Sequence, residues 1–126
     1  MMPAKPAILL LMPDAHLRDI YIERFERSGW EAEAGNNLTD AERRAVQLHP
    51  KILLIHYALL DNVKTTFKHL RSLPTLQKTL IVVMDKQLPK AVVNELLAAG
   101  ADEIVLTAHQ TPQELIASLI PDAGRQ

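Results

Sequence analysis

The sequence predicts a doubly wound α/β domain, a three-layer (βα)5 sandwich in which helices cover both faces of a five-stranded parallel sheet. Three segments, 7–11, 52–55 and 80–83, are continuously apolar, which is typical of strands that are covered on both faces. Segments with apolar residues at a spacing of three and four lie between these runs and indicate helices. The resulting order is βαβαβαβαβα, and right-handed crossovers then place helices on both faces of the sheet.

Two further strands complete the predicted sheet. In segment 30–34, Trp30, Ala32 and Ala34 alternate with Glu31 and Glu33, so one face of this segment is polar. Such a strand suits the edge of the sheet, where one face meets water. The run 104–106 predicts the fifth strand.

The first three predicted helices have start and stop residues that fit their apolar spacing. Asp14 is available as the cap of the first helix, and Gly29 lies just past its end. Pro50 stops the second helix and Pro74 stops the third. The apolar positions of these helices are Leu17, Ile20, Tyr21, Phe25, Leu38, Ala41, Ala45, Leu48, Val63, Phe67 and Leu70.

The last two predicted helices are bounded in the same way. Pro89 opens the fourth helix and Gly100 closes it. Thr111, Pro112 and Glu114 form a capping box with proline in the first turn, which predicts the start of the fifth helix. The residues of the fourth helix that we expect to face the core are Val92, Val93, Leu96 and Leu97.

Composition limits the classes of function. The chain has 126 residues, and we expect one domain over 1–126 with an ordered core at about 6–120. It contains no cysteine, which excludes disulfides, zinc-thiolate sites and thiol nucleophiles and fits a cytoplasmic location. The net charge of -1 argues against a direct nucleic-acid or membrane ligand. The apolar run 7–12 is too short to span a membrane.

Three local strings tighten the fold prediction. Residues 92–106 read VVNELLAAGADEIVL, residues 8–18 read ILLLMPDAHLR and residues 50–55 read PKILLI. They resemble parts of the receiver domain of bacterial response regulators, the CheY-like family. The string 92–106 is similar to the fourth helix, the following turn and the fifth strand of that domain. The string 8–18 is similar to its first strand and the loop after it, and the string 50–55 to its third strand. The resemblance covers nearly the whole chain and implies a flavodoxin-like receiver topology and a part in two-component signal transduction.

The resemblance also identifies the positions at which receivers carry out phosphoryl transfer. In that family an acidic pair holds Mg²⁺, an aspartate accepts the phosphoryl group, and a hydroxyl residue and a lysine complete the site. The acidic pair falls on Met12 and Pro13 here, and the acceptor falls on His56. The hydroxyl position falls on Met84 and the lysine position on Thr107. Because phosphoryl transfer depends on placed charges around a metal, this set is expected to be inactive.

The primary hypothesis is therefore a pseudo-receiver that is not an enzyme. It would act independently of phosphorylation, by binding a protein partner or an output domain, and it would need no cofactor. Met12 and Met84 are expected to form an apolar plug where Mg²⁺ and water sit in receivers. The alternative is a small-molecule or metal sensor that uses the vacated pocket. An enzyme of another chemistry is a third possibility, which no acid-base or nucleophile pair in the sequence supports.

A metal site has a few candidate ligands just past the predicted strand ends. They are Asp14, His56, Asp85 and His109, and carboxylates with imidazoles are ligands of zinc. The competing interpretation is that Asp14 caps a helix, Asp85 begins a loop and His56 fills the space of an aspartate. No ligand spacing is diagnostic, so the structural interpretation is preferred and no metal is expected.

Two other groups of residues have both a functional and a structural interpretation. Lys64, Lys68 and Arg71, with Arg43 and Arg44 on the preceding helix, could form a nucleic-acid surface or merely solvated helix faces. The balanced charge favours the solvated faces. In the loop 57–62, the apolar residues could form a contact patch or fold back as a cover on the vacated site. These loop residues are Tyr57, Leu59 and Leu60.

The resemblance also implies a contact face. In receivers the fourth helix, fifth strand and fifth helix commonly form the surface for dimers and partners, after phosphorylation moves a threonine and an aromatic residue. Met84 and Ile104 occupy those two positions here, so the face is expected to hold one conformation. Lys90, Ile104 and Glu114 are the candidate residues of this face, through which a homodimer could form. The alternative is a monomer in which these charges only serve solvation.

Overall fold

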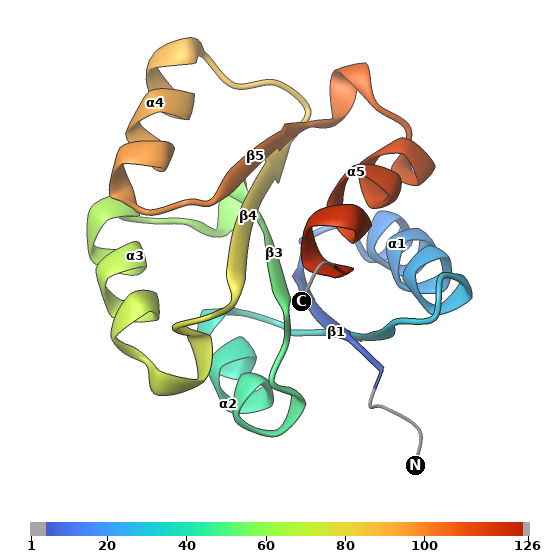
Figure 1. Cartoon of the computed structure of the whole chain (residues 1–126). Coiled ribbons are helices and arrows are strands. Elements are labelled where there is room, and N and C mark those ends of the chain that lie inside the picture. The colour runs from blue at the N-terminus through green and yellow to red at the C-terminus, as the bar shows by residue number, and fades with distance from the viewer. Residues whose placement is uncertain (1–4, 125–126) are drawn as a thin grey trace.

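The computed structural model describes residues 5–124 and has the predicted arrangement, with helices on both faces of one parallel sheet (Figure 1). The five strands are β1 (Ala7–Leu11), β2 (Glu31–Ala34), β3 (Ile52–His56), β4 (Leu80–Asp85) and β5 (Glu103–Leu106). The five α-helices are α1 (Ala15–Arg27), α2 (Leu38–Leu48), α3 (Val63–Ser72), α4 (Lys90–Ala99) and α5 (Pro112–Gly124). The prediction of a doubly wound α/β fold is confirmed.

The strand order β2-β1-β3-β4-β5 places β2 and β5 at the two edges of the sheet. Every residue of β1 is buried, and β3 is buried up to its last residue, His56. In β2, by contrast, Glu31 is exposed and the other residues are half-buried. The predicted edge position of β2 is thus confirmed, and the buried central strands explain why their sequences do not alternate.

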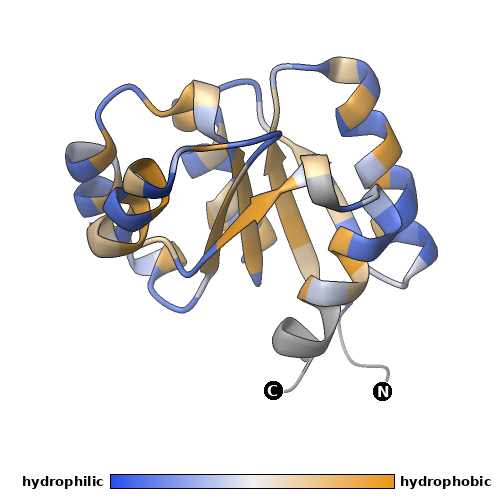
Figure 2. Ribbon diagram, turned by 90° about the horizontal axis from the view of Figure 1, so that it is seen from above, coloured by the Kyte–Doolittle hydropathy of each residue, from blue (hydrophilic) through white to orange (hydrophobic). Residues whose placement is uncertain are grey.

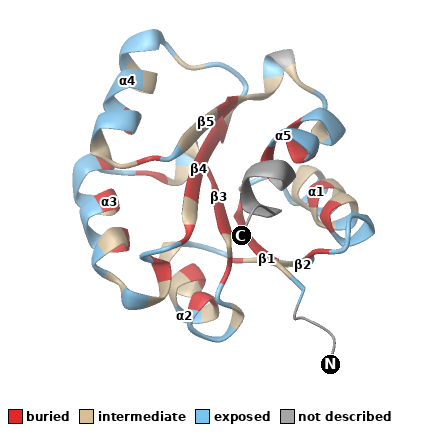
Figure 3. Ribbon diagram, in the orientation of Figure 1, coloured by how far each residue is buried: buried red, intermediate tan, exposed pale blue. Residues whose placement is uncertain are grey.

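Two hydrophobic layers enclose the sheet. Alternate residues of β1 enter different layers, because successive side chains of a strand point to opposite faces: Ile8 faces α1 and α5, and Leu9 faces α2, α3 and α4. Tyr21 and Phe25 of α1 lie in the first layer, and Phe67 of α3 lies in the second. Figure 2 shows apolar strands between helices whose outer faces are hydrophilic, and Figure 3 shows the buried residues concentrated in the strands.

Local hydrogen bonds fix the helix starts that the sequence indicates. Oδ1 of Asp14 accepts the N–H of Leu17 at 3.1 Å, which caps α1. The Thr111 N–H donates to Oε1 of Glu114 at 3.1 Å, and the Glu114 N–H donates to Oγ1 of Thr111 at 3.2 Å. Both predicted caps are therefore confirmed, and the second is a reciprocal capping box. Gly100, with a φ of 128°, ends α4 in a conformation that favours glycine.

The predicted orientation of α4 needs a correction. Of the four residues expected to face the core, only Leu96 is buried, Val92 and Val93 are half-buried, and Leu97 is 47% exposed. The prediction for Leu97 is wrong because successive residues of a helix point about 100° apart, and α4 covers only the β4–β5 end of the sheet. Despite its apolar composition, neither α4 nor any other helix within residues 5–124 is long and apolar enough to cross a membrane.

Candidate functional site

A pocket of about 360 Å³ opens at the carboxyl ends of β1, β3 and β4. The strand register explains its position, because Leu11 pairs with Ile55 and His56 pairs with Met84, so the residues that end or follow these strands share one edge. All the positions that the resemblance marks line this pocket, namely Met12, Pro13, His56, Met84 and Thr107. The remaining lining residues are Asp14, Leu17, Tyr21, Asp85, Lys86, Gln110 and Pro112.

Two methionines form the floor of the pocket. Met12 is 3% exposed and Met84 is 1% exposed, and both belong to the layer between the sheet and helices α1 and α5. Their thioethers carry no charge, whereas Mg²⁺ binds oxygen ligands. The predicted proximity of the two side chains is confirmed. The prediction of a plug is wrong, since the methionines leave an open pocket above them.

His56 ends β3 and directs its imidazole toward Asp85 on the neighbouring strand. Its Nδ1 accepts the N–H of Ala58 at 3.1 Å, and its Nε2 lies 3.7 Å from Oδ1 of Asp85. Because the lone pair of Nδ1 is used on that N–H, the neutral imidazole carries its proton on Nε2. His56 therefore offers a hydrogen-bond donor, and not a metal-binding lone pair, on its Asp85 side.

The candidate metal ligands do not converge on one point. Asp14 caps α1, as the structural interpretation expects. Asp85 is the last residue of β4 and not the start of a loop, and its Oδ1 accepts the N–H of Lys86 at 2.6 Å. Within residues 5–124 no three side chains of histidine, cysteine, aspartate or glutamate form a group that could hold a metal ion. The side chain of His109 lies outside the described residues.

Tyr21 is a pocket residue that sequence reasoning assigned only to the core. Its side chain comes from α1, lines the pocket and is 1% exposed. Burial raises the pKa of Tyr21, so its hydroxyl stays protonated at neutral pH. The helical spacing of α1 placed Tyr21 on the inner face, but the spacing does not indicate that this face ends at a cavity.

Thr107 and Gln110 complete the polar wall of the pocket. Oγ1 of Thr107 lies 3.5 Å from the carbonyl oxygen of Asp85, at the limit of a hydrogen bond. Thr107 begins a single 3-10 turn (Thr107–His109) that joins β5 to α5, and Gln110 follows this turn. Thr107 thus offers a neutral hydrogen-bonding group at the position where the resemblance places a lysine.

The loop after β3 does not cover this pocket. Leu60 is buried in the layer beneath α2, α3 and α4, and Tyr57 and Leu59 pack against the same layer half-buried. None of these residues lines the pocket at the carboxyl ends of the strands. The interpretation of this loop as a cover is therefore wrong, because its apolar side chains enter the opposite face of the sheet.

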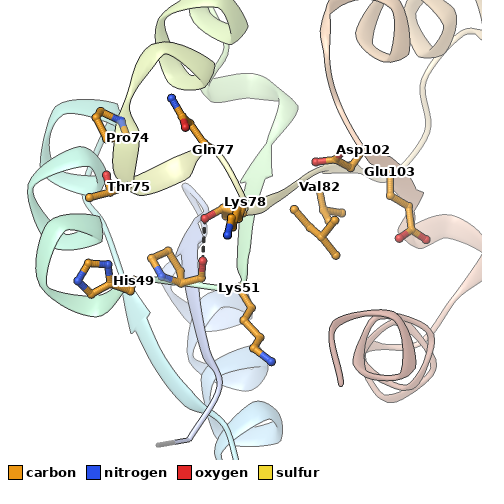
Figure 4. A pocket seen from close by; sticks show the side chains of 12 residues that line it. His49, Lys51, Pro74, Thr75, Gln77, Lys78, Val82, Asp102 and Glu103 are labelled. Atoms are coloured by element: carbon orange, nitrogen blue, oxygen red, sulfur yellow. Dashed lines mark hydrogen bonds between the residues drawn. The ribbon is translucent and has the colours of Figure 1, made fainter. Parts of the chain in front are cut away.

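A second pocket, of about 800 Å³, lies at the amino ends of β3, β4 and β5 (Figure 4). Sequence reasoning missed it, because its walls come from three segments, 49–51, 74–82 and 102–103, that are separated in the chain. Within its lining, the Thr79 hydroxyl donates to the carbonyl oxygen of Pro50 at 2.7 Å. The lining residues are His49, Pro50, Lys51, Pro74, Thr75, Gln77, Lys78, Thr79, Leu80, Val82, Asp102 and Glu103.

An ion pair between Arg71 and Asp102 ties the loops around this second pocket together. Arg71 also donates to the carbonyl oxygens of Thr79 at 2.8 Å and Gly100 at 3.3 Å, and Asp102 accepts the N–H of Ile81 at 2.7 Å. These contacts are directed at backbone groups of the fold. The pocket wall also mixes cationic and anionic side chains, so we assign it no ligand and place the candidate site at the carboxyl ends of the strands, where doubly wound sheets bind ligands.

Of the five lysine and arginine residues on α2 and α3, three are paired with carboxylates, whereas Lys64 and Lys68 are exposed on α3. Arg43 and Arg44 both contact the carboxylate of Asp40, and Arg44 also lies 3.3 Å from Glu33. Arg71 is paired with Asp102. The interpretation of these helix faces as solvated and internally paired is favoured over a nucleic-acid surface.

The candidate contact face lies around the β5 edge of the sheet, and Figure 1 shows β5 between α4 and α5. Lys90 is the exposed first residue of α4, and Ile104 is half-buried on β5. Glu114 is exposed in the first turn of α5, where hydrogen bonds from the backbone N–H and the hydroxyl of Thr111 lower the pKa of its carboxyl group. Its carboxylate is therefore committed to the capping box.

No protein-family model and no curated protein matches the sequence of this chain. Solved structures match its fold. The chemotaxis protein CheY4 of Vibrio cholerae superposes with a TM-score of 0.81 at 16% identity, over 94% of this chain and 98% of that chain. An orphan response regulator of H. pylori superposes with a TM-score of 0.79 at 14% identity, over 95% of this chain and 97% of that one.

A third similar structure was solved with a ligand. It is the receiver domain of a sensor histidine kinase from Pseudomonas aeruginosa, with a magnesium ion coordinated in its active-site cleft. It superposes with a TM-score of 0.78 at 16% identity, over 96% of this chain and 99% of that chain. At these identities the likeness concerns the backbone. The chain has the flavodoxin-like fold of the CheY-like receiver domains of response regulators.

Proposed function

We propose that this chain is a pseudo-receiver, a signal-transduction domain that acts by protein–protein contacts and independently of aspartyl phosphorylation. The observation that supports the proposal is the composition of the pocket at the strand ends. A receiver needs carboxylates there for Mg²⁺ and for the acyl phosphate. At the positions where receivers carry these carboxylates and the hydroxyl residue, the pocket instead presents the thioethers of Met12 and Met84 and the imidazole of His56. The two carboxylates that do line the pocket make local contacts, since Asp14 caps α1 and Asp85 accepts the N–H of Lys86.

We infer that the contact surface is the face formed by α4, β5 and α5. Leu97 is one of two large hydrophobic side chains that are exposed within the described residues, and half-buried Val93 lies one helical turn away from it. The other exposed hydrophobic residue, Val46, stands on α2 between Ala45 and Gln47, near the ion-paired Arg43 and Arg44. An exposed apolar side chain on the helix that contacts the edge strand β5 favours a contact at α4 over one at α2.

The edge strand adds a groove to this face. β5 pairs with β4 on one side only, and a groove of about 380 Å³ runs between β5 and α5. Its walls carry the half-buried Ile104 and Leu106 together with polar Gln110 and Ser118. Protein–protein interfaces likewise combine apolar and polar side chains. A second copy of this chain is the occupant that we propose to test.

Sedimentation of the wild type and of two matched variants tests this surface. Leu97→Glu places a charge on the exposed apolar position of α4, and Val46→Glu does the same on α2. If α4 forms the interface, Leu97→Glu should weaken self-association by about tenfold or more, because a central apolar contact is lost and a charge is desolvated. Val46→Glu should leave the association unchanged.

Two outcomes contradict the assignment of this face. One is a wild type that stays monomeric at high micromolar concentration. The other is equal loss of association in the Leu97 and Val46 variants, which would move the contact away from α4. Circular dichroism of both variants controls for unfolding, and neither position is buried, so both variants should fold.

A second candidate function is a small-molecule sensor that uses the same strand-end pocket. The pocket favours it because the two methionines leave about 360 Å³ open, which is within the range of volumes that hold small ligands. A metal ligand is disfavoured, because the proton on Nε2 of His56 blocks coordination on its Asp85 side. The two functions are compatible, since a ligand in the pocket would lie beside the turn that leads into α5.

A further inference from the structure

We propose that the pocket at the carboxyl ends of β1, β3 and β4 binds an uncharged, planar heteroaromatic molecule that carries a hydrogen-bond acceptor beside a donor, as a purine base does. The proposal deepens the second candidate function and is independent of the contact face on α4. Three properties of the pocket support this class of ligand: its floor, its hydrogen-bonding groups and its charge.

The floor suits the face of an aromatic ring. Met12 and Met84 present thioethers, and sulfur packs favourably against aromatic rings. Leu17 and Pro112 add apolar surface from α1 and α5. A pocket of about 360 Å³ has room for a bicyclic ring, and methionine side chains can adjust to its outline.

Two donors on the pocket wall call for an acceptor on the ligand. The hydroxyl of Tyr21 makes no hydrogen bond in the described part of the chain, although the side chain is 1% exposed and lines the pocket. The hydroxyl oxygen of Tyr21 is not among the fully buried polar atoms without a partner, so it can donate to a molecule in the pocket. His56 supplies the second donor, its Nε2–H, which faces Asp85 across a gap of 3.7 Å. An acceptor atom of the ligand would satisfy the Tyr21 hydroxyl.

Asp85 favours a hydrogen-bond donor on the ligand. Its carboxylate lies on the same wall and can accept more than the N–H of Lys86 that it already binds. The edge of a ligand could therefore approach both groups from the pocket side, accepting from Nε2 of His56 and donating to Asp85. The Gln110 amide at the wall offers both a donor and an acceptor. A heteroaromatic edge with adjacent acceptor and donor atoms matches this pattern, whereas a hydrocarbon ring does not.

The charges around the pocket disfavour anions. Asp14 and Asp85 contribute two negative charges and Lys86 contributes one positive charge, which leaves a negative balance at neutral pH. Phosphates and carboxylates are repelled by this balance. An uncharged ligand avoids the repulsion and also avoids the cost of burying its own charge against the methionine floor.

Calorimetric titration of the full chain with adenine tests the proposal, with benzoate as a planar anion for comparison. Adenine should bind and benzoate should not. Tyr21→Phe keeps the buried ring and removes only the hydroxyl, so it should weaken adenine binding by about 3- to 10-fold, the contribution of one hydrogen bond. The matched control is Tyr57→Phe, which removes a hydroxyl outside the pocket and should leave the affinity unchanged.

A second pair of variants tests the location without touching a hydrogen bond of the ligand. Thr107→Trp places a ring at a pocket residue and should abolish binding, whereas Ala108→Trp, on the exposed neighbouring residue, should not. No adenine binding, equal binding of benzoate, or adenine binding that Tyr21→Phe and Thr107→Trp leave intact would each overturn the proposal. The Leu97→Glu variant tests self-association separately. If Leu97→Glu weakens self-association but adenine does not bind, only the present inference is overturned, and the proposed contact face stands.

Discussion

Nε2 of His56 faces Oδ1 of Asp85 at 3.7 Å, across the carboxyl ends of β3 and β4. The same imidazole accepts the backbone N–H of Ala58 through Nδ1, so the ring is held between a backbone donor and a carboxylate. In a phosphorylating receiver the His56 position would carry the acceptor aspartate. An imidazole cannot form the acyl phosphate that a carboxylate forms, so under the proposed function the pair serves hydrogen bonding.

The first prediction concerns phosphorylation. Incubation with Mg²⁺ and a small phosphodonor should add no phosphate, because neither Met12 nor Met84 can hold the metal and His56 cannot form an acyl phosphate. Mg²⁺ with beryllofluoride should likewise leave the NMR spectrum unchanged. Intact-mass spectrometry is the decisive measurement, and an adduct with the mass of one phosphate would refute the proposed pseudo-receiver.

The second prediction concerns restoring the acceptor. His56→Asp alone should not take up phosphate, because the Mg²⁺ ligands and the lysine are still missing. It should lower the free energy of unfolding by about 1–2 kcal/mol relative to His56→Asn at neutral pH, since a second carboxylate beside Asp85 is repelled by it. His56→Asn is the matched control, because its amide can still accept the Ala58 N–H. Chemical denaturation measures the difference, and phosphate uptake by His56→Asp would contradict our account of the site.

The third prediction concerns charges on the contact face. Lys90→Glu should weaken self-association severalfold at low salt, as rim charges do. It should not destabilise the fold, because a glutamate in the first turn of α4 interacts favourably with the helix dipole. Sedimentation at two salt concentrations measures the effect. An association that is unchanged by Lys90→Glu would place this residue outside the interface.

Two further charge reversals, Glu114→Lys and Arg43→Glu, also change the stability of the fold, so stability must be measured together with association. Glu114→Lys should also weaken association, but it breaks the capping box with Thr111 and should lower the melting temperature. Arg43→Glu should lower stability, because it breaks the ion pair with Asp40, and should leave association intact. Loss of association in the Arg43 variant would indicate a contact through α2.

The fourth prediction concerns His49, which ends α2 in the left-handed conformation with a φ of 48°. A residue with a Cβ is strained there, so His49→Gly should raise the free energy of unfolding by about 0.5–1 kcal/mol. Gln47→Gly, inside the same helix, is the control and should lower it by about 1 kcal/mol. Thermal denaturation that shows the same sign for both variants would contradict this interpretation.

The fifth prediction concerns pH. Hydrogen bonds from Arg43, Arg44 and the Asn36 N–H hold the pKa of Asp40 far below its ordinary value of 3.8. A carboxyl group whose pKa is lowered on folding contributes stability above its unfolded pKa, and this contribution is lost as the pH falls toward the folded pKa. Asp40→Asn should therefore melt at a lower temperature than the wild type at neutral pH, and the difference should shrink below about pH 4.

An exposed ion pair provides the control for the pH experiment. Glu23 and Arg27 lie 2.7 Å apart on α1 with both side chains largely exposed. Glu23→Gln should change the melting temperature little at any pH, because solvent screens such a pair. A pH dependence of the same size in the Glu23 and Asp40 variants would show that the three hydrogen bonds to Asp40 have no special effect.

The sequence by itself determined the order of the elements, the parallel sheet and most helix ends. These features are local: continuous apolar runs mark covered strands, and the Asp14 cap and the Thr111–Glu114 capping box act within one helical turn. It also indicated which positions meet at the strand ends, because a parallel sheet brings the carboxyl ends of its strands together. The resemblance then identified Met12, His56 and Met84 as the residues there.

Only the tertiary structure decided how those side chains fill space. Spacing along α4 could not separate buried Leu96 from exposed Leu97, because the width of sheet that a helix covers depends on its position in the sheet. Apolar composition could not distinguish a plug from a floor at Met12 and Met84, because the open volume depends on α1 and α5, which pack from elsewhere in the chain. The donor role of His56 likewise follows from a backbone N–H and a neighbouring strand that only folding brings to the two sides of its ring.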